Sequence, residues 1–119
     1  MRYIVLCERG HYVETQMKRG LLDVCVLKAL EAEDSYGYQI IKDISPYIAI
    51  SESTLYPILR RLEADHYLTV YSAEHNGRLR KYYRITDAGR QKIKAFLQEW
   101  EEVMVIYRYI ENETKRVQQ

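Results

Sequence analysis

Basic side chains gather in one part of this sequence. Seven of them lie between His75 and Lys94 against a single acid, Asp87, although the net charge of the 119-residue chain is only +1. They are Arg78, Arg80, Lys81, Arg84, Arg90, Lys92 and Lys94. A concentrated basic strip is the electrostatic footprint of a surface that binds the phosphates of DNA. On charge alone, the alternative is a basic surface that is simply solvated.

A second candidate for anion binding is the stretch from residue 51 to residue 63, which reads SESTLYPILRRLE. At about 100° per residue, Leu55 and Leu59 fall on one apolar face of a helix and Pro57 falls on the opposite face. If Ser53 is the N-cap, Pro57 loses only the first intrahelical hydrogen bond, where a proline costs least. The helix then starts with hydroxyls and free backbone N–H groups, which suit an anionic partner.

Two helices are predicted ahead of this stretch. Apolar residues wrap most of the segment 18–33, so we expect a helix that is buried on more than one side. Asp34 or Ser35 is the expected N-cap of a short helix over 36–44, which Pro46 closes. The stretch described above continues as a third helix to about residue 65.

A hairpin and a long helix are predicted after it. Asn-Gly at 76–77 separates two runs rich in aromatic and β-branched residues, 67–71 and 79–85, and this is a strong signal for a β-hairpin. Thr86 is the expected cap of a last helix that reaches about residue 113. Three helices followed by a hairpin is the element order of a winged helix-turn-helix domain, so the predicted fold is mainly α with a small hairpin.

The last helix carries an apolar stripe that the domain itself is too small to cover. The helix spans roughly 40 Å at 1.5 Å per residue. A second copy of the chain is the expected cover, giving a two-fold dimer through the first and last helices. The residues expected in the interface are Leu21, Leu22, Cys25, Leu97, Trp100, Met104 and Tyr107.

Three motifs in order resemble the PadR-type transcriptional regulators. They are Ser35-Tyr36-Gly37-Tyr38-Gln39-Ile40, then residues 53–63, STLYPILRRLE, and then residues 77–86, GRLRKYYRIT, with Gly89. The resemblance covers about residues 17–110. It implies a homodimeric repressor that binds a palindromic operator in double-stranded DNA and is released by a small-molecule effector. The third helix is then expected in the major groove, with the hairpin wing at the backbone or minor groove.

The DNA-binding residues follow from this resemblance and from the residue types. The first turns of the third helix, the wing and the start of the first helix supply them: Lys18, Arg19, Ser53, Thr54, Tyr56, Arg60, Arg61, Arg78, Arg80 and Lys81. Arg61 either reaches a phosphate or pairs with Asp65, four residues on. Tyr82 and Tyr83 are expected to pack within the hairpin.

The compact branch of the family, with one C-terminal helix, includes regulators that bind a planar aromatic effector between tryptophans. Trp100 matches that place in the helix, so it either stacks on an effector or packs in the dimer interface. His66 departs from the family pattern, because a glycine usually ends the recognition helix there; histidine still takes the left-handed conformation more readily than most residues.

The chain divides into an N-terminal extension of unknown role (1–16), a winged helix-turn-helix domain (17–86), and a dimerisation helix with its tail (87–119). The extension has no counterpart in the family pattern, and Met17 is either internal or the natural start. No membrane span or leader pattern is present, so a soluble, cytoplasmic protein is expected. Cys7 and Cys25 are expected to be reduced.

An enzyme is not predicted. His11, His66 and His75 are scattered, and no catalytic, metal-binding or phosphate-loop motif accompanies them, so neither a cofactor nor a metal is expected. A winged-helix module that binds other proteins, with the wing as the docking surface, is the alternative function. The salt dependence of DNA binding distinguishes the two.

Overall fold

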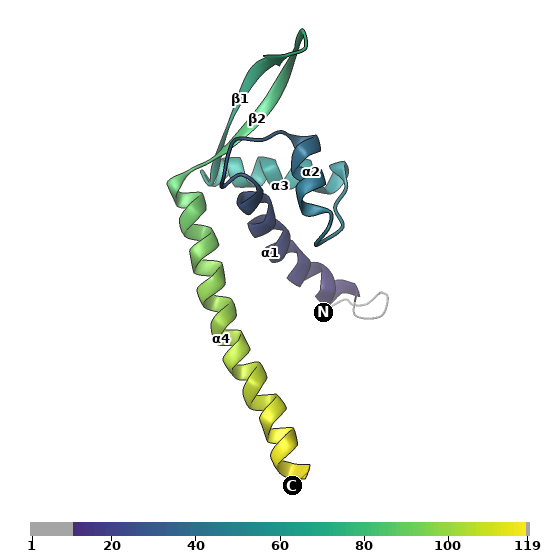
Figure 1. The fold of residues 1–119 in the computed structure, drawn as a ribbon, viewed down its shortest axis with the longest axis vertical. Helices are drawn as coiled ribbons and strands as arrows, with labels where there is room; N and C mark the ends of the chain where they lie inside the picture. Colours follow the sequence, from purple (N-terminus) through teal and green to yellow (C-terminus); the bar gives the residue numbers. More distant parts are fainter. Residues whose placement is uncertain (1–10, 119) are drawn as a thin grey trace.

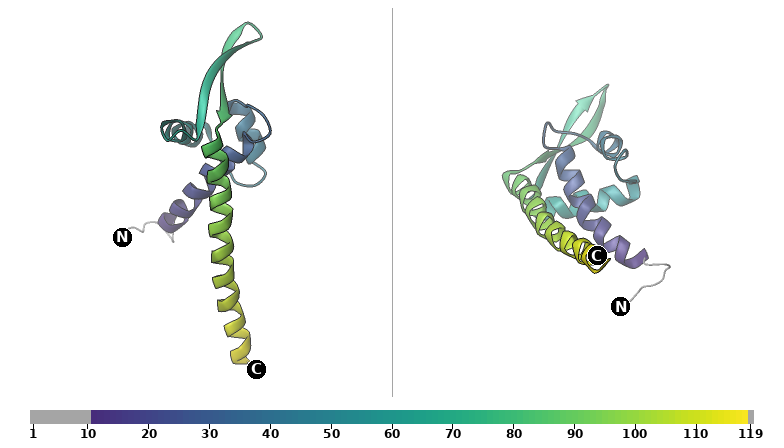
Figure 2. Two further views of the ribbon diagram at one scale, coloured as in Figure 1. Left: turned by 90° about the vertical axis from the view of Figure 1, so that its left-hand side faces the viewer. Right: turned by 60° about the horizontal axis from the view of Figure 1, so that its bottom comes forward.

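Three helices, a hairpin and a long final helix follow one another in the predicted order. The computed structural model describes residues 11–118, and the side chains of residues 19–112. The elements are α1 (His11–Ala29), α2 (Gly37–Ile44), α3 (Glu52–Ala64), β1 (Leu68–His75), β2 (Arg78–Ile85) and α4 (Asp87–Gln118). The molecule measures 67 × 32 × 25 Å, with the hairpin projecting from one end and α4 from the other (Figures 1 and 2).

The core lies where α1, α2 and α3 pack together under the base of the hairpin. Its fully buried side chains come from all three helices and from β1: Val26, Leu27, Leu30, Ile40, Leu55, Leu59, Leu62 and Leu68. Each buried leucine or isoleucine contributes about 1.5–3 kcal/mol through the apolar surface removed from water. The apolar face predicted for α3 is therefore the face that holds this helix in the domain.

The start of α3 differs from the prediction. Its N-cap is Ser51, not Ser53, and the backbone N–H of Leu55 donates to the Ser51 carbonyl at 2.9 Å. Pro57 therefore lies deeper in the helix than expected and cannot donate to the carbonyl of Ser53. Both Ser53 and Pro57 are exposed, so water can satisfy that carbonyl.

The hairpin forms as predicted, with longer strands. Asn76 and Gly77 have φ values of 52° and 79°, as a two-residue turn of type I′ requires. The antiparallel register runs from Leu68 opposite Ile85 to His75 opposite Arg78. Only the base of the hairpin touches the core, and the outer half projects into solvent (Figure 1).

His66 ends α3 in the left-handed conformation, with φ 67°. The N–H of Tyr67 donates to the Leu62 carbonyl at 2.9 Å, and the N–H of His66 donates to the Glu63 carbonyl at 2.9 Å. This is the pair of hydrogen bonds of a Schellman motif, in which His66 takes the position usually given to glycine. The turn survives the departure from the family pattern.

Thr86 caps α4, as predicted. Its hydroxyl accepts a hydrogen bond from the Gly89 N–H at 3.1 Å and donates one to the His66 carbonyl at 2.8 Å. The same side chain therefore ties the end of α3 to the start of α4.

The first two helices begin at other residues than predicted. The first helix starts at His11, before the apolar pattern begins, because extending an existing helix costs little per residue. The N-cap of α2 is Tyr36, not Asp34 or Ser35. Ser35 instead pairs through its backbone with Tyr83, and Asp34 contacts the hairpin. The part of the predicted extension before His11 lies outside the described residues.

Replacement of glycine by alanine is expected to change the free energy of unfolding in opposite directions at two positions. A Cβ at Gly89 would lie 2.3 Å from the Tyr67 carbonyl oxygen, whereas a Cβ at the exposed Gly20 in α1 meets nothing within 4 Å. Gly89→Ala should lower the free energy of unfolding by about 1–3 kcal/mol, because backbone must shift. Gly20→Ala should raise it by about 0.5–1 kcal/mol through helix propensity. Urea unfolding measures both, and a Gly89→Ala chain as stable as the wild type would contradict the close contact.

Candidate nucleic-acid interface

The first two turns of α3 present polar side chains to solvent. Ser53, Thr54, Tyr56 and Arg60 are exposed, while the apolar residues between them face the core. The Ser51 hydroxyl lies 3.0 Å from that of Ser53 and 3.2 Å from that of Thr54. The start of α3 is thus a small platform of hydroxyl groups beside a tyrosine.

A cleft of about 530 Å³ separates this helix from the hairpin and from the start of α2. Tyr36, Tyr38 and Tyr56 line it together with two wing cations, Arg80 and Lys81. At the α2 side of the cleft, Gly37 and the Tyr56 side chain lie close together: a Cβ at Gly37 would lie 2.2 Å from the Tyr56 hydroxyl oxygen. Glycine at position 37 therefore leaves room for the Tyr56 side chain against the start of α2.

The predicted DNA-binding residues fall into two groups. Tyr56, Arg60 and Lys81 line one hollow beside β2. Arg19, Thr54 and Arg61 line another hollow, of about 460 Å³, between α1 and α3. Arg78 stands apart, exposed at the hairpin turn, and the side chain of Lys18 lies outside the described residues.

Arg61 does not pair with Asp65, one of the two partners that the sequence suggests. Its guanidinium forms a hydrogen bond and ion pair with Asp23 of α1, not with Asp65. The exposed fractions of the two side chains are 35% and 15%. This partly buried pair links α1 to α3 and neutralises the Arg61 charge within the chain.

Arg80 is held from two sides. Its guanidinium carbon lies 3.5 Å from the centre of the Tyr36 ring, and its Nη2 donates to the Tyr82 hydroxyl at 2.7 Å. Neither contact neutralises the positive charge of Arg80. Together they fix the direction of its guanidinium. Lys81, the next residue, is exposed.

Tyr82 and Tyr83 pack within the fold, as expected. Tyr83 is 5% exposed, and burial raises the pKa of its hydroxyl. Tyr82 stacks on Tyr71 of the facing strand with ring centres 5.6 Å apart. The Tyr71 hydroxyl in turn donates to Asp34 at 2.6 Å.

Asp34 was not singled out by the sequence as a functional residue. Its Oδ2 accepts hydrogen bonds from Tyr71 and from Arg84, whose Nη2 lies 3.0 Å away. These bonds, from Tyr71 first and then Arg84, hold the pKa of Asp34 below its ordinary value, and Asp34 raises the pKa of Tyr71. No local sequence pattern indicates this role of Asp34, because Asp34 and its partners lie in segments far apart in the sequence.

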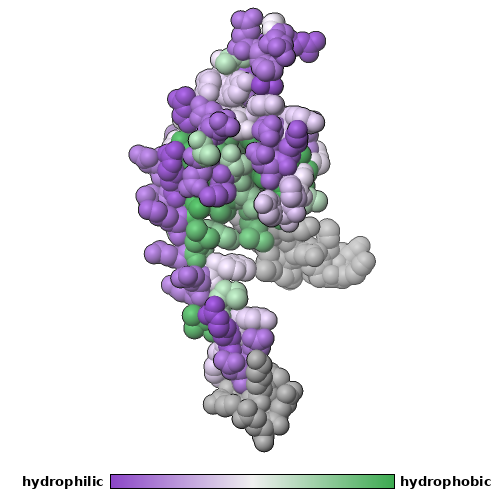
Figure 3. Space-filling model, viewed as in Figure 1, coloured by the Kyte–Doolittle hydropathy of each residue, from purple (hydrophilic) through white to green (hydrophobic). Residues whose placement is uncertain are grey.

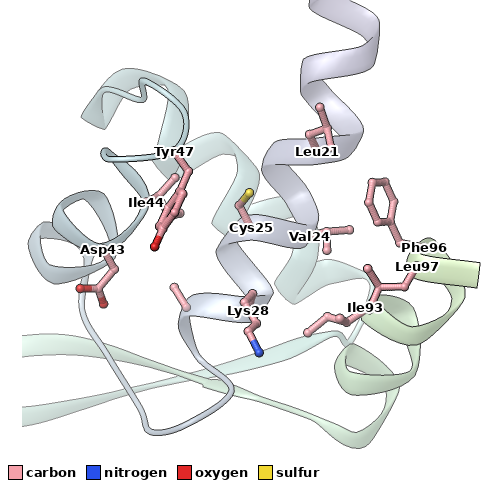
Figure 4. A pocket seen from close by; sticks show the side chains of 11 residues that line it. Leu21, Val24, Cys25, Lys28, Asp43, Ile44, Tyr47, Ile93, Phe96 and Leu97 are labelled. Carbon is pink, nitrogen blue, oxygen red and sulfur yellow. The ribbon is translucent and has the colours of Figure 1, made fainter. Parts of the chain in front are cut away.

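An apolar groove of about 470 Å³ runs between α1, the end of α2 and the start of α4 (Figure 4). Leu21, Val24 and Cys25 form its α1 wall, and Phe96 and Leu97 form its α4 wall. Burial raises the pKa of the Cys25 thiol, which is not in a disulfide. The space-filling view shows an apolar surface between the domain and the upper part of α4 (Figure 3).

Apolar side chains continue along α4 beyond this groove. Leu97 is 58% exposed and Tyr107 is 53% exposed, and Trp100 stacks on Phe96 with ring centres 5.9 Å apart. Leu22, by contrast, is 7% exposed and faces the core of its own chain, so it leaves little surface for a partner. Of the expected interface residues on α1, Leu21 and Cys25 are the two that line the groove.

Within the described residues, no three His, Cys, Asp or Glu side chains lie close enough to hold one metal ion. The same part of the chain has no helix with the length and apolarity needed to span a membrane.

One protein-family model matches more than half of the chain. The model of the "Transcriptional regulator PadR-like family" matches residues 26–95, which run from α1 to the start of α4. The chain belongs to the PadR-like family of transcriptional regulators. This confirms the resemblance carried by the three sequence motifs and the winged helix-turn-helix fold with its long C-terminal helix.

Individual relatives agree with this assignment. A Lysinibacillus sphaericus protein is 36% identical over 99 residues, which are 79% of this chain and 91% of that protein. The structure of a transcriptional regulator from Clostridium thermocellum has 36% identity and a TM-score of 0.71, over 78% of this chain and 95% of that one. Bacillus subtilis PadR, solved in complex with operator DNA, shares the fold at 23% identity and a TM-score of 0.61, over 65% and 46% of the two chains. The family and these structural neighbours are transcriptional regulators, a class of proteins that generally are not enzymes.

Proposed function

We propose that this PadR-like regulator binds an operator as a homodimer, with α3 and the β1–β2 wing on the DNA, and represses transcription until a small-molecule effector releases it. The observation that carries the proposal is the cleft between α3 and β2. One of its walls is the wing strand with Arg80 and Lys81, and the other includes Tyr56 on the exposed face of α3. Cations beside an exposed polar helix face are what phosphate contact and base readout require.

The polar residues at the start of α3 and the cations are proposed to have different roles. Ser53, Thr54 and Tyr56 stand on the exposed start of α3, where side chains reach base edges in a helix-turn-helix complex. Arg60, Arg78, Arg80 and Lys81 are assigned to the backbone phosphates, together with the exposed Arg19 in the middle of α1. Arg61 is left out, because Asp23 already neutralises its guanidinium. Bacillus subtilis PadR, which shares the fold, was solved in complex with operator DNA.

A homodimer is proposed because much of the apolar surface of α4 is exposed within the described part of the chain. The groove is lined by Leu21, Cys25 and Leu97, and the stripe continues through Trp100, Met104 and Tyr107. Exposed apolar surface that is continuous over a groove and a helix is typical of a protein interface. A two-fold axis near α4 would place two copies of α3 on one side, which matches a palindromic operator.

The effector is proposed at Trp100. Its ring is 38% exposed and stacked on Phe96, at the end of the groove that Phe96 and Leu97 line. A flat aromatic face beside an apolar groove suits a planar aromatic compound. The competing role, packing against the second copy of α4, uses the same surface.

Loss of a cation from the wing or from α3 should weaken binding to all duplexes alike. Lys81→Ala and Arg60→Ala should each reduce the slope of log affinity against log salt concentration by about 0.9, because one phosphate contact is lost. Arg61→Gln, which removes a cation already paired with Asp23, should leave the slope unchanged. Fluorescence anisotropy on a random duplex measures the slopes. An unchanged slope in both Lys81→Ala and Arg60→Ala would favour the protein-docking alternative.

A charge in the apolar stripe should separate the dimer. Leu97→Glu should shift the chain from dimer to monomer in sedimentation velocity, because a carboxylate would be buried without a partner. Gln98→Glu adds the same charge at the adjacent exposed position and should leave the dimer intact. If Leu97→Glu sediments as the wild type does, α4 is not the interface.

Trp100 is the only tryptophan of the chain, so its fluorescence reports this site without interference. Acridine, a planar aromatic probe, should quench the Trp100 emission of the DNA-free protein in a saturable way. A chain whose emission shows no saturable quenching would leave Trp100 as packing in the interface.

A further inference from the structure

The segment before α2 pairs with β2 through one isolated antiparallel bridge, between Ser35 and Tyr83. Ser35 donates to the Tyr83 carbonyl at 3.1 Å, and Tyr83 donates to the Ser35 carbonyl at 2.8 Å. Ser35 and Tyr83 are both buried on the core side of the sheet. Because side chains alternate along an extended segment, Asp34 and Tyr36 both reach the opposite, solvent side of the hairpin.

Asp34 joins both strands of the wing on that side. One carboxylate oxygen, Oδ2, accepts from the Tyr71 hydroxyl of β1 at 2.6 Å and from Arg84 Nε of β2 at 3.1 Å. The exposed fraction of the Asp34 side chain is 26%. A carboxylate with several donors, one of them a guanidinium, forms the stronger class of hydrogen bonds.

From Asp34 the contacts continue to a wing cation. Tyr71 stacks on Tyr82, with ring centres 5.6 Å apart and an angle of 15° between the rings. The Tyr82 hydroxyl accepts from Arg80, whose guanidinium lies over Tyr36. Tyr71, Tyr82 and Arg80 thus form a continuous row of contacts across the solvent face of the hairpin. Asp34 contacts one end of this row and Tyr36 contacts the other.

The hairpin needs such support because a two-stranded sheet alone is only marginally stable in water. Its core face is buried at Leu68, Tyr83 and Ile85, all near the base, and most residues from Tyr71 to Leu79 are exposed. The angle of the outer wing to the domain therefore depends on contacts along its solvent face.

We propose that Asp34 is a positioning residue for DNA binding: it anchors the wing to the segment before α2 and so holds Arg80 and Lys81 toward the phosphates. Asp34 itself touches no DNA in this account. The inference rests on the proposed function, because it assumes that the wing contacts DNA.

The sign of one substitution separates positioning from simple electrostatics. Removing a negative charge next to a phosphate-binding surface should by itself strengthen DNA binding. If Asp34 positions the wing, Asp34→Asn should instead weaken binding, by about tenfold, the loss expected for one well-placed contact. Glu33→Gln removes the same charge from the exposed neighbouring residue and should leave binding equal or slightly tighter.

The experiment uses the full chain and a duplex selected from a random library with the wild type. Anisotropy gives the affinity of the wild type, Asp34→Asn, Glu33→Gln and Tyr71→Phe, which loses a donor to Asp34 without changing any charge. Hydrogen–deuterium exchange of the free proteins gives the protection of the wing amides. We expect Asp34→Asn and Tyr71→Phe to bind more weakly and to exchange faster in β1 and β2, with protection in α1 and α3 unchanged.

Equal or tighter DNA binding by Asp34→Asn, with wild-type protection of the wing, overturns the inference. A wild-type chain for which selection enriches no duplex overturns the proposed function instead. In that case the wing amides still decide whether Asp34 anchors the hairpin, because their exchange is measured without DNA.

Discussion

One junction of hydrogen bonds sets the relative placement of α3, the wing and α4. The end of α3, the start of β1, the end of β2 and the start of α4 meet there. Tyr67 donates to the last turn of α3, Thr86 donates to the Tyr67 carbonyl at 3.1 Å, and the Thr86 hydroxyl bridges His66 and Gly89. The Tyr67 carbonyl also lies close to Gly89, where any side chain would collide with it. Within this junction the recognition helix, the wing and the long helix have little freedom to move separately.

This junction connects the two surfaces on which the proposed function depends. At one end of it, α3 and the wing form the cleft with Tyr56 and Lys81; at the other, α4 leaves the domain with its apolar stripe uncovered. In a dimer formed through α4, the angle between the two copies of that helix would set the distance between the two recognition helices. An effector bound beside Trp100 would then act on DNA binding by changing that angle, without touching α3.

The elements set by local sequence were predictable, and those set by distant partners were not. Asn76-Gly77, the apolar face of α3 and the Thr86 cap were found because each signal lies within a few residues of the structure it forms. The caps of α2 and α3 were misplaced by one or two residues, because several neighbouring residues have suitable side chains and tertiary contacts choose among them. For Arg61 the sequence suggests a phosphate or the nearby Asp65, whereas its partner in the fold is Asp23 on α1. Asp34 could not be found, since its role requires the register of the hairpin and the Ser35–Tyr83 bridge.

The central claim is that two copies of this chain read one DNA site through α3 and the wing. The most direct test is fluorescence anisotropy of the wild type on the DNA upstream of its own gene and on a shuffled duplex of equal length, titrated across a salt series. The account predicts tight, salt-sensitive binding to the upstream DNA, saturating at two chains per site, and much weaker binding to the shuffled duplex. No binding to either duplex even at low salt would contradict it and favour a winged helix that docks on proteins.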